Sequence, residues 1–168
     1  HQIYEGLLDY APGSTEVVPV LATEWEPSAD GLEWTFKLRQ GVKFHDGTPF
    51  NAEAVKINFD RWRDTSNPLH VGGEFPYYSY MFGGFDEDSV IQDVVVVDEY
   101  TVKFVLKQVQ ASFLQDIAMV PFAIASPKAL QENPEGLNTQ PVGTGPFKFV
   151  SWTKGDRIVL EANPDYWG

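Results

Sequence analysis

Apolar and polar residues alternate most clearly in the stretch from Glu33 to Arg39. A period of two places successive side chains on opposite faces of a β-strand. The sequence therefore predicts a strand with one buried face and one face in water. The two faces are Trp34, Phe36 and Leu38 on the buried side, and Thr35, Lys37 and Arg39 on the other side.

A helical period follows at residues 52–62. Asn51 is a favourable N-cap for this helix, and Glu53 stands near the positive end of the helix dipole. Apolar side chains recur at positions i, i+4 and i+7, which indicates one buried face. These side chains are Val55, Phe59 and Trp62.

Two hairpins are predicted. Residues 90–97 and 101–106 are rich in β-branched residues and are joined through residues 98–100. Residues 147–152 and 157–162 are separated by the turn Lys154-Gly155-Asp156. Short helices are expected over residues 111–119 and after Ser126, where Pro127 occupies the first helical position.

The remaining segments give weaker patterns. Residues 3–8 are interpreted as the end of a helix, residues 122–125 as a buried strand and residues 133–141 as a loop. Residues 64–88 hold four Gly, three Tyr and three Phe without a helical or strand period. A long aromatic loop of this kind is either functional or poorly ordered.

Composition narrows the class of protein. The chain has 168 residues, about the size of one domain, and 43% of them are hydrophobic, which argues against disorder. A net charge of −12 without a Lys/Arg cluster argues against a nucleic-acid partner. The longest apolar runs, such as residues 94–97, are far shorter than the roughly 20 residues of a membrane helix, so no membrane span is expected.

Catalytic and metal-binding patterns are weak. There is no Cys and no Gly-x-Ser-x-Gly, and only three His are present, so a serine-type hydrolase is disfavoured. In the turn at His45-Asp46, the carboxylate is expected to bond its own backbone rather than a metal. The acidic run at residues 86–88 lacks the alternating ligand pattern of a calcium loop. No cofactor and no metal are expected.

Residues 143–147 read GTGPF, which superficially suggests a phosphate loop. The run lacks the following Lys-Ser/Thr, and Pro146 removes an amide donor that such a loop would use. We interpret it as a tight backbone crossing before a strand. His1 without a preceding Met, and the two aromatics Tyr166 and Trp167 at the other end, suggest a piece of a longer protein.

Residues 30–52 read DGLEWTFKLRQGVKFHDGTPFNA, which closely resembles the signature of extracytoplasmic solute-binding proteins of family 5. These are the peptide- and nickel-binding receptors of ABC importers. Further pieces stand in the expected order: IYEGL at 3–7, LATEW at 21–25, DEYTV at 98–102, SPK at 126–128, GTGPF at 143–147 and NPDYW at 163–167. The resemblance covers essentially the whole chain.

The resemblance implies an α/β fold of the periplasmic-binding-protein type II kind, cluster C. The chain is then a partial N-terminal lobe with mixed β-sheets and flanking helices. An inserted subdomain spans about residues 7–141, and residues 142–168 return as a hairpin to the sheet of the main lobe. The second lobe is missing, so weak or absent ligand binding is expected from this piece alone.

The implied function is the substrate-binding component of an ABC importer, which captures di- or oligopeptides in a cleft between two lobes. Its partners would be the ligand and the membrane permease subunits. It would be located in the periplasm or held by a lipid anchor on the outer face of the cell membrane. A nickel chelate or an oligosaccharide is the alternative ligand within the family, and a hydrolase is the alternative outside it. A third possibility is a lobe that mainly docks the permease.

The resemblance also suggests ligand contacts. Peptide-binding relatives carry a Tyr in an Asn-Pro-Tyr-like context after the helix that follows the signature, where this chain has Leu69. The side chains that offer a replacement are His70, Tyr77, Tyr78 and Tyr80, although such aromatics are as often simply packed. Phe122 is a further candidate for a ligand contact. It stands in the run VPFA at 120–123, near which metal-chelate binders carry an Arg. The absence of that Arg here favours a peptide as the ligand.

Overall fold

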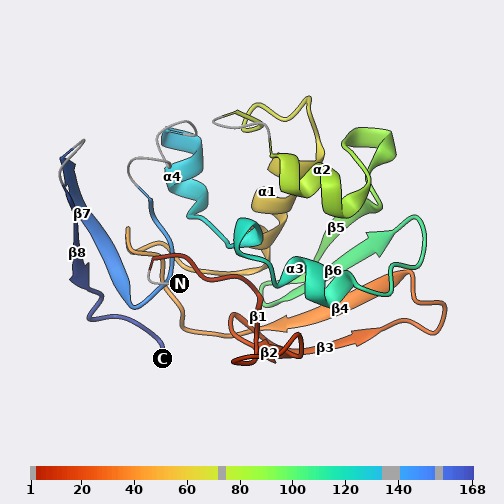
Figure 1. Cartoon of the computed structure of the whole chain (residues 1–168), viewed down its shortest axis with the longest axis horizontal. Helices are drawn as coiled ribbons and strands as arrows, with labels where there is room; N and C mark the ends of the chain where they lie inside the picture. Colours follow the sequence, from red (N-terminus) through yellow and green to blue (C-terminus); the bar gives the residue numbers. More distant parts are fainter. Residues whose placement is uncertain (1–2, 72–74, 134–140, 154–156) are drawn as a thin grey trace.

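The centre of the fold is a four-stranded antiparallel sheet. The computed structural model describes residues 3–71, 75–133, 141–153 and 157–168. The strand order is β3-β4-β6-β5. The strands are β3 (Ala22–Pro27), β4 (Glu33–Leu38), β5 (Ile91–Asp98) and β6 (Thr101–Leu106), and helices lie over one face of the sheet (Figure 1).

Strand β4 confirms the alternating pattern of its sequence. Phe36 and Leu38 are buried, and Trp34 is partly buried against the same core. The Phe36 ring meets the Phe104 ring of β6 edge to face, with centroids 5.4 Å apart. The predicted hairpin of β5 and β6 is also confirmed, and β6 pairs with β4 on its other side.

Helix α1 (Ala52–Arg63) begins where the sequence predicts. The Asn51 side chain accepts a hydrogen bond from the Ala54 N–H at 3.1 Å, which satisfies one of the free donors of the first turn. The predicted apolar face is buried, and the Phe59 ring lies 4.8 Å from the Phe104 ring of the sheet. Burial of this face holds the helix on the sheet.

Shorter helical segments occur elsewhere in the described ranges. They are α2 (Pro76–Phe82), the 3-10 turn η1 (Asp86–Asp88), α3 (Phe113–Ile117), the 3-10 turn η2 (Val120–Phe122) and α4 (Pro127–Glu132). The predictions of α3 and α4 are confirmed, and the Ser126 side chain caps α4 through the Ala129 N–H at 3.2 Å.

The expectation of an irregular loop over residues 64–88 is wrong at α2. This helix has only seven residues, begins after Phe75 in the left-handed conformation and ends at Gly83, also left-handed. Two buried rings, Tyr78 and Phe82, fix it against the core. A helix held by two contacts is too short to show a period in the sequence.

Two smaller sheets flank the centre. Strand β1 (Leu8–Tyr10) pairs with β2 (Val17–Pro19), and β7 (Phe147–Thr153) pairs with β8 (Arg157–Ala162), both antiparallel. The second predicted hairpin is therefore confirmed, while its turn at 154–156 and most of the expected loop at 133–141 lie outside the described residues. Figure 1 shows β7 and β8 at the end of the molecule away from α2.

Two short predictions fail for one reason. Residues 3–7 have no helical structure and Leu8 begins β1, and residues 123–125 form no regular strand. The two segments meet where the Ile124 N–H donates to the Glu5 carbonyl at 2.9 Å. Their backbone groups are satisfied by this long-range contact, which a local pattern does not reveal.

The α/β class with flanking helices is confirmed. The strand pairs within the described ranges are all antiparallel, where mixed sheets were expected.

Replacement of Phe59 by Ala tests the core. Phe59 is fully buried and touches the sheet and η2, so the F59A variant is expected to lose about 3–5 kcal/mol of unfolding free energy in urea denaturation. Tyr80→Ala is the control, because its side chain is 81% exposed and its loss should stay within about 0.5 kcal/mol. Equal losses in the two variants would contradict this packing.

Candidate functional site

The site begins at a close crossing of two backbone segments. A Cβ atom added at Gly143 would lie 2.4 Å from the Ile3 carbonyl oxygen and 2.7 Å from the Tyr4 ring. The Gly145 N–H donates to the same Ile3 carbonyl at 2.8 Å. The predicted backbone crossing at residues 143–147 is confirmed, and only glycine fits there.

Glu5 is the centre of the crossing. The residue is only 7% exposed, and its carboxylate accepts three hydrogen bonds from distant parts of the chain. Thr144 Oγ1 and Trp167 Nε1 donate to Oε1 at 2.9 and 2.7 Å, and the Tyr166 hydroxyl donates to Oε2 at 2.9 Å. A buried carboxylate requires such donors, since desolvation would otherwise strongly disfavour its charge.

The two aromatics near the end of the sequence are thereby fixed in place. Burial, reinforced by the Glu5 carboxylate, raises the pKa of Tyr166 to about 12, so its hydroxyl remains a donor. The Arg39 guanidinium lies 4.0 Å from the centre of the Trp167 ring. This cation–π contact places a positive charge near the Glu5 cluster.

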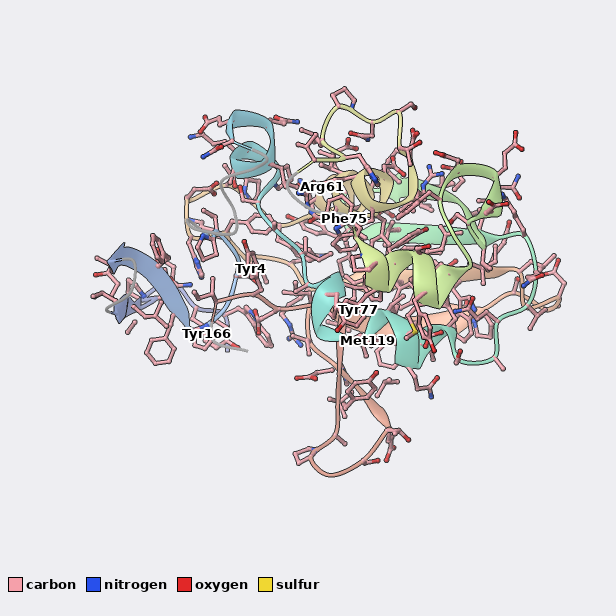
Figure 2. The ribbon with its side chains drawn as sticks, turned by 45° about the horizontal axis from the view of Figure 1, so that its top comes forward. Tyr4, Arg61, Phe75, Tyr77, Met119 and Tyr166 are labelled. Carbon is pink, nitrogen blue, oxygen red and sulfur yellow. The ribbon has the colours of Figure 1, made fainter. Side chains whose placement is uncertain are left out.

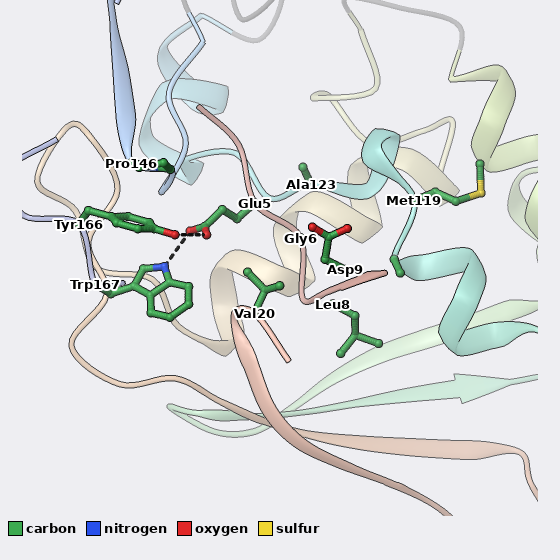
Figure 3. Close-up of a pocket in the computed structure, with 11 residues that line it drawn as sticks. Glu5, Gly6, Leu8, Asp9, Val20, Met119, Ala123, Pro146, Tyr166 and Trp167 are labelled. Carbon is green, nitrogen blue, oxygen red and sulfur yellow. Dashed lines mark hydrogen bonds between the residues drawn. The ribbon is translucent and has the colours of Figure 1, made fainter. Parts of the chain in front are cut away.

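A cavity of about 280 Å³ opens beside Glu5. Figure 3 shows Glu5 and its two aromatic partners at one end and Met119 at the other. The walls expose polar and apolar surface in similar amounts and carry two carboxylates. The lining residues are Glu5, Gly6, Leu8, Asp9, Val20, Ala118, Met119, Ala123, Pro146, Tyr166 and Trp167. The volume is just below the usual range for small-molecule pockets, so it suits one group of a ligand.

The residues singled out from the sequence lie elsewhere, around α2. Tyr77 and Tyr80 are 55% and 81% exposed and present their rings to solvent. Tyr78 and Phe122 are 1% and 2% exposed and pack in the core. The Tyr78 hydroxyl lies 2.7 Å from Ser89 Oγ, and burial raises the pKa of Tyr78. Neither Tyr78 nor Phe122 offers surface to a ligand in this structure.

Leu69 and His70 are tied to α1 by Arg61, which is 8% exposed. Arg61 Nε donates to the Leu69 carbonyl at 2.7 Å, and His70 Nδ1 lies 2.7 Å from the Arg61 carbonyl. The guanidinium also lies 4.7 Å from the centre of the Phe75 ring, and Figure 2 shows the two side chains together above α2. Burial lowers the pKa of Arg61.

None of the six sequence-predicted residues lines the cavity. The two regions nevertheless adjoin, because α2 contacts η2, which follows directly after Met119. In Figure 2, Tyr166 lies toward the end of the molecule that carries β7 and β8, away from the labelled Tyr77.

Sequence reasoning missed Glu5, Asp9 and Met119 as lining residues. Glu5 and Tyr166 stood in two quoted motifs, but nothing local signals that they meet. Their partnership joins positions 161 residues apart.

The expected turn at His45-Asp46 is confirmed. Asp46 Oδ1 accepts from the Thr48 N–H and hydroxyl at 3.1 and 2.5 Å, and Asp46 Oδ2 accepts from Ser126 Oγ. Across the described ranges, no three His, Asp or Glu side chains gather as a metal site would require. In the same ranges, no helix has the length and apolarity to cross a bilayer.

Comparison with known proteins decides the family. The sequence model of the bacterial extracellular solute-binding proteins, family 5, matches residues 16–168. The chain belongs to this family. It is 40% identical to the di/tripeptide-binding protein 2 of Pseudomonas aeruginosa (strain UCBPP-PA14) over 181 aligned positions, covering 99% of this chain and 33% of that protein.

Solved structures of the family agree with the fold. The periplasmic binding protein DppA from Helicobacter pylori, in complex with the peptide STSA, aligns with a TM-score of 0.85 at 36% identity, covering 99% of this chain and 34% of that one. NikZ from Campylobacter jejuni, in complex with Ni(L-His), aligns with a TM-score of 0.77 at 28% identity, covering 99% and 31%. The chain thus spans about a third of the length of these relatives.

Replacement of Gly143 by Ala tests the crossing that builds the site. The added methyl group would meet backbone and ring atoms that have no room to move, so G143A is expected to lose about 3 kcal/mol in urea denaturation. Gly13→Ala is the matched control: Gly13 has a φ of +69° but open space around it, so only about 1 kcal/mol of backbone strain is expected. A smaller loss at Gly143 than at Gly13 would contradict the crossing.

Proposed function

We propose that this chain is part of the substrate-binding component of an ABC importer, and that the whole protein captures di- or oligopeptides in a cleft between two lobes. The observation that carries the proposal is the likeness to a peptide-bound family member at a TM-score of 0.85 with 36% identity over nearly the whole chain. The 40% identity to a di/tripeptide-binding protein supports the same ligand class.

The chemistry of the lobe is compatible with a peptide. The cavity combines apolar and polar wall surface, including the carboxylates of Glu5 and Asp9, which suits an uncharged side chain or a positively charged amino group. Beside it, Tyr77 and Tyr80 present flat rings with polar tips, a surface that packs against extended chains. Of the residues suggested by the sequence, Tyr77, Tyr80 and His70 are proposed as direct ligand contacts.

Tyr78 and Phe122 are assigned a different part in the proposal. Their rings lie 6.2 Å apart in the core behind α2 and support the helix that carries the two exposed tyrosines. Leu69 is proposed to act through its backbone position, which Arg61 fixes.

The proposed domain organisation follows the family. Residues from about 7 to 141 would form a subdomain inserted into the lobe, and residues 142–168 would return as the hairpin of β7 and β8. Permease subunits are the proposed membrane partners. The periplasm, or a lipid anchor at the outer face of the membrane, is the proposed location.

A nickel chelate is the second candidate ligand, and the likeness to the Ni(L-His) complex favours it. That likeness is weaker than the likeness to the peptide complex, with 28% against 36% identity and a TM-score of 0.77 against 0.85. Peptides therefore remain the proposed ligands.

Calorimetry tests the proposal at two chain lengths. A cleft receptor encloses its ligand between two surfaces, so this chain alone is expected to bind di- and tripeptides more weakly than micromolar. The protein extended to the length of its relatives is expected to gain about 2.7 kcal/mol of stability at a peptide concentration of 100 Kd.

Nickel–histidine complexes serve as the control ligand in the same titrations. Micromolar or tighter peptide binding by this chain alone would contradict the two-lobe account. Stabilisation of the long form by the nickel complex, and not by any peptide, would overturn the proposed ligand class.

A further inference from the structure

The His45 ring lies between two backbone groups of the crossing. Its Nε2 lies 2.9 Å from the Gly145 carbonyl oxygen, and its Nδ1 lies 3.4 Å from the Gly143 nitrogen. The His45 N–H also donates to the Gly143 carbonyl at 2.9 Å. One residue of the signature turn thus holds the crossing through both its ring and its backbone.

The partners fix the protonation state of the ring. A backbone N–H only donates, so Nδ1 must accept from Gly143; a carbonyl only accepts, so Nε2 must donate to Gly145. Both requirements are met by the neutral ring with its proton on Nε2. A protonated ring would direct a second N–H at the N–H of Gly143.

The crossing has little freedom to avoid that conflict. Gly143 is packed so closely that a Cβ atom would lie 2.4 Å from the Ile3 carbonyl. On the other side, Gly145 is held by its N–H bond to Ile3 at 2.8 Å. Protonation of His45 would therefore break a contact rather than shift it.

Hydrogen bonds connect the crossing to the segment that contains the aromatic wall of the cavity, Tyr166 and Trp167. The Gly145 carbonyl also accepts from Asn163 Nδ2 at 3.2 Å, and the Asn163 N–H donates to the Pro146 carbonyl at 2.8 Å. Asn163 begins the turn that leads to Tyr166 and Trp167. Loosening of residues 143–146 would thus reach the two rings bonded to Glu5.

Charged groups surround the ring on three sides. Asp46 follows it in the turn and Glu5 lies in the N-terminal segment; both carboxylates favour the protonated ring. Lys128 lowers the pKa of Asp46 and so keeps that carboxylate charged. Lys148 of β7 opposes protonation. Burial is the largest influence and, against the Gly145 carbonyl and the two carboxylates, lowers the pKa of His45 below its ordinary 6.5.

We propose that His45 is an acid-sensitive clasp: the neutral ring holds the Gly143–Gly145 crossing and the Tyr166–Trp167 wall of the cavity, and protonation in mild acid releases them. The clasp itself does not depend on the proposed function. Its effect on ligand retention rests on the proposal that the cavity is part of the ligand site.

The direction of the pH effect follows from linkage. Because the folded pKa of His45 lies below 6.5, the unfolded or opened chain binds more protons as the pH falls through 6.5. The stabilisation is complete above pH 6.5, decreases as the pH falls towards the folded pKa, and is constant below it. Opening of the clasp should increase as the pH falls through that window, by at most about tenfold for each pH unit.

Two measurements on the ligand-free chain test the clasp. Imidazole nitrogen NMR is expected to show His45 with its proton on Nε2 at pH 7.5 and a pKa below 6.5. Amide exchange at Gly145 and Asn163, corrected for intrinsic pH dependence, is expected to show increased opening in acid. Both amides donate to backbone carbonyls of this region.

Two variants separate the clasp from general acid sensitivity. His45→Gln keeps one acceptor and one donor without titrating, so its opening should not change with pH in this window. His70→Gln removes a ring bonded to α1 instead, and should respond as the unchanged chain does.

The outcomes discriminate clearly. A proton on Nδ1, a His45 pKa at or above 6.5, or an equal acid response in H45Q and the unchanged chain would overturn the proposal. If H45Q fails to fold, the NMR titration of the unchanged chain still decides it. Peptide binding by the longer protein is a separate measurement, so failure of the clasp leaves the proposed function intact.

Discussion

The structure depends on satisfying the hydrogen bonds of one carboxylate in a nearly buried position. The Glu5 carboxylate meets this requirement by accepting hydrogen bonds from residues 144, 166 and 167. These bonds hold the first described segment against the last. In the part of the chain that the structure describes, no buried side-chain polar atom lacks a hydrogen-bond partner. Removal of one donor should therefore cost more than the loss of that single hydrogen bond, because the carboxylate would remain buried with one of its bonds unmade.

The same constraint shapes the site. The rings that Glu5 holds form one wall of the cavity, and the segment that carries Glu5 forms the floor through Gly6 and Leu8. Gly143 allows the crossing to close over this segment, and His45 links the signature turn to it. The signature turn thus supports the wall of the cavity. The exposed tyrosines of α2 belong to a neighbouring region that meets the cavity at Met119.

Local period was sufficient to predict β4 and α1, since each buries one face. Both hairpins could be predicted from strand-forming runs separated by short turns, and their strands have six residues or more. Local period failed at α2, which two buried rings hold in place, and at the segment that begins at Ile3, where the backbone partners of Ile3 and Glu5 lie more than 100 positions away. The candidate site was predicted least well. Aromatic residue types do not distinguish Tyr77, which is exposed, from Tyr78, which is buried one position later. The pairing of Glu5 with Trp167 has no local signal at all.

A double-mutant cycle between Glu5 and Trp167 tests this account most directly. Glu5→Ala, Trp167→Phe and the double variant would be compared with the unchanged chain by urea denaturation; W167F keeps an aromatic ring but loses the Nε1 donor. If the carboxylate holds the wall of the cavity, the two changes should be coupled by about 1–3 kcal/mol. Losses that simply add would show that Trp167 packs independently of Glu5 and would contradict the account.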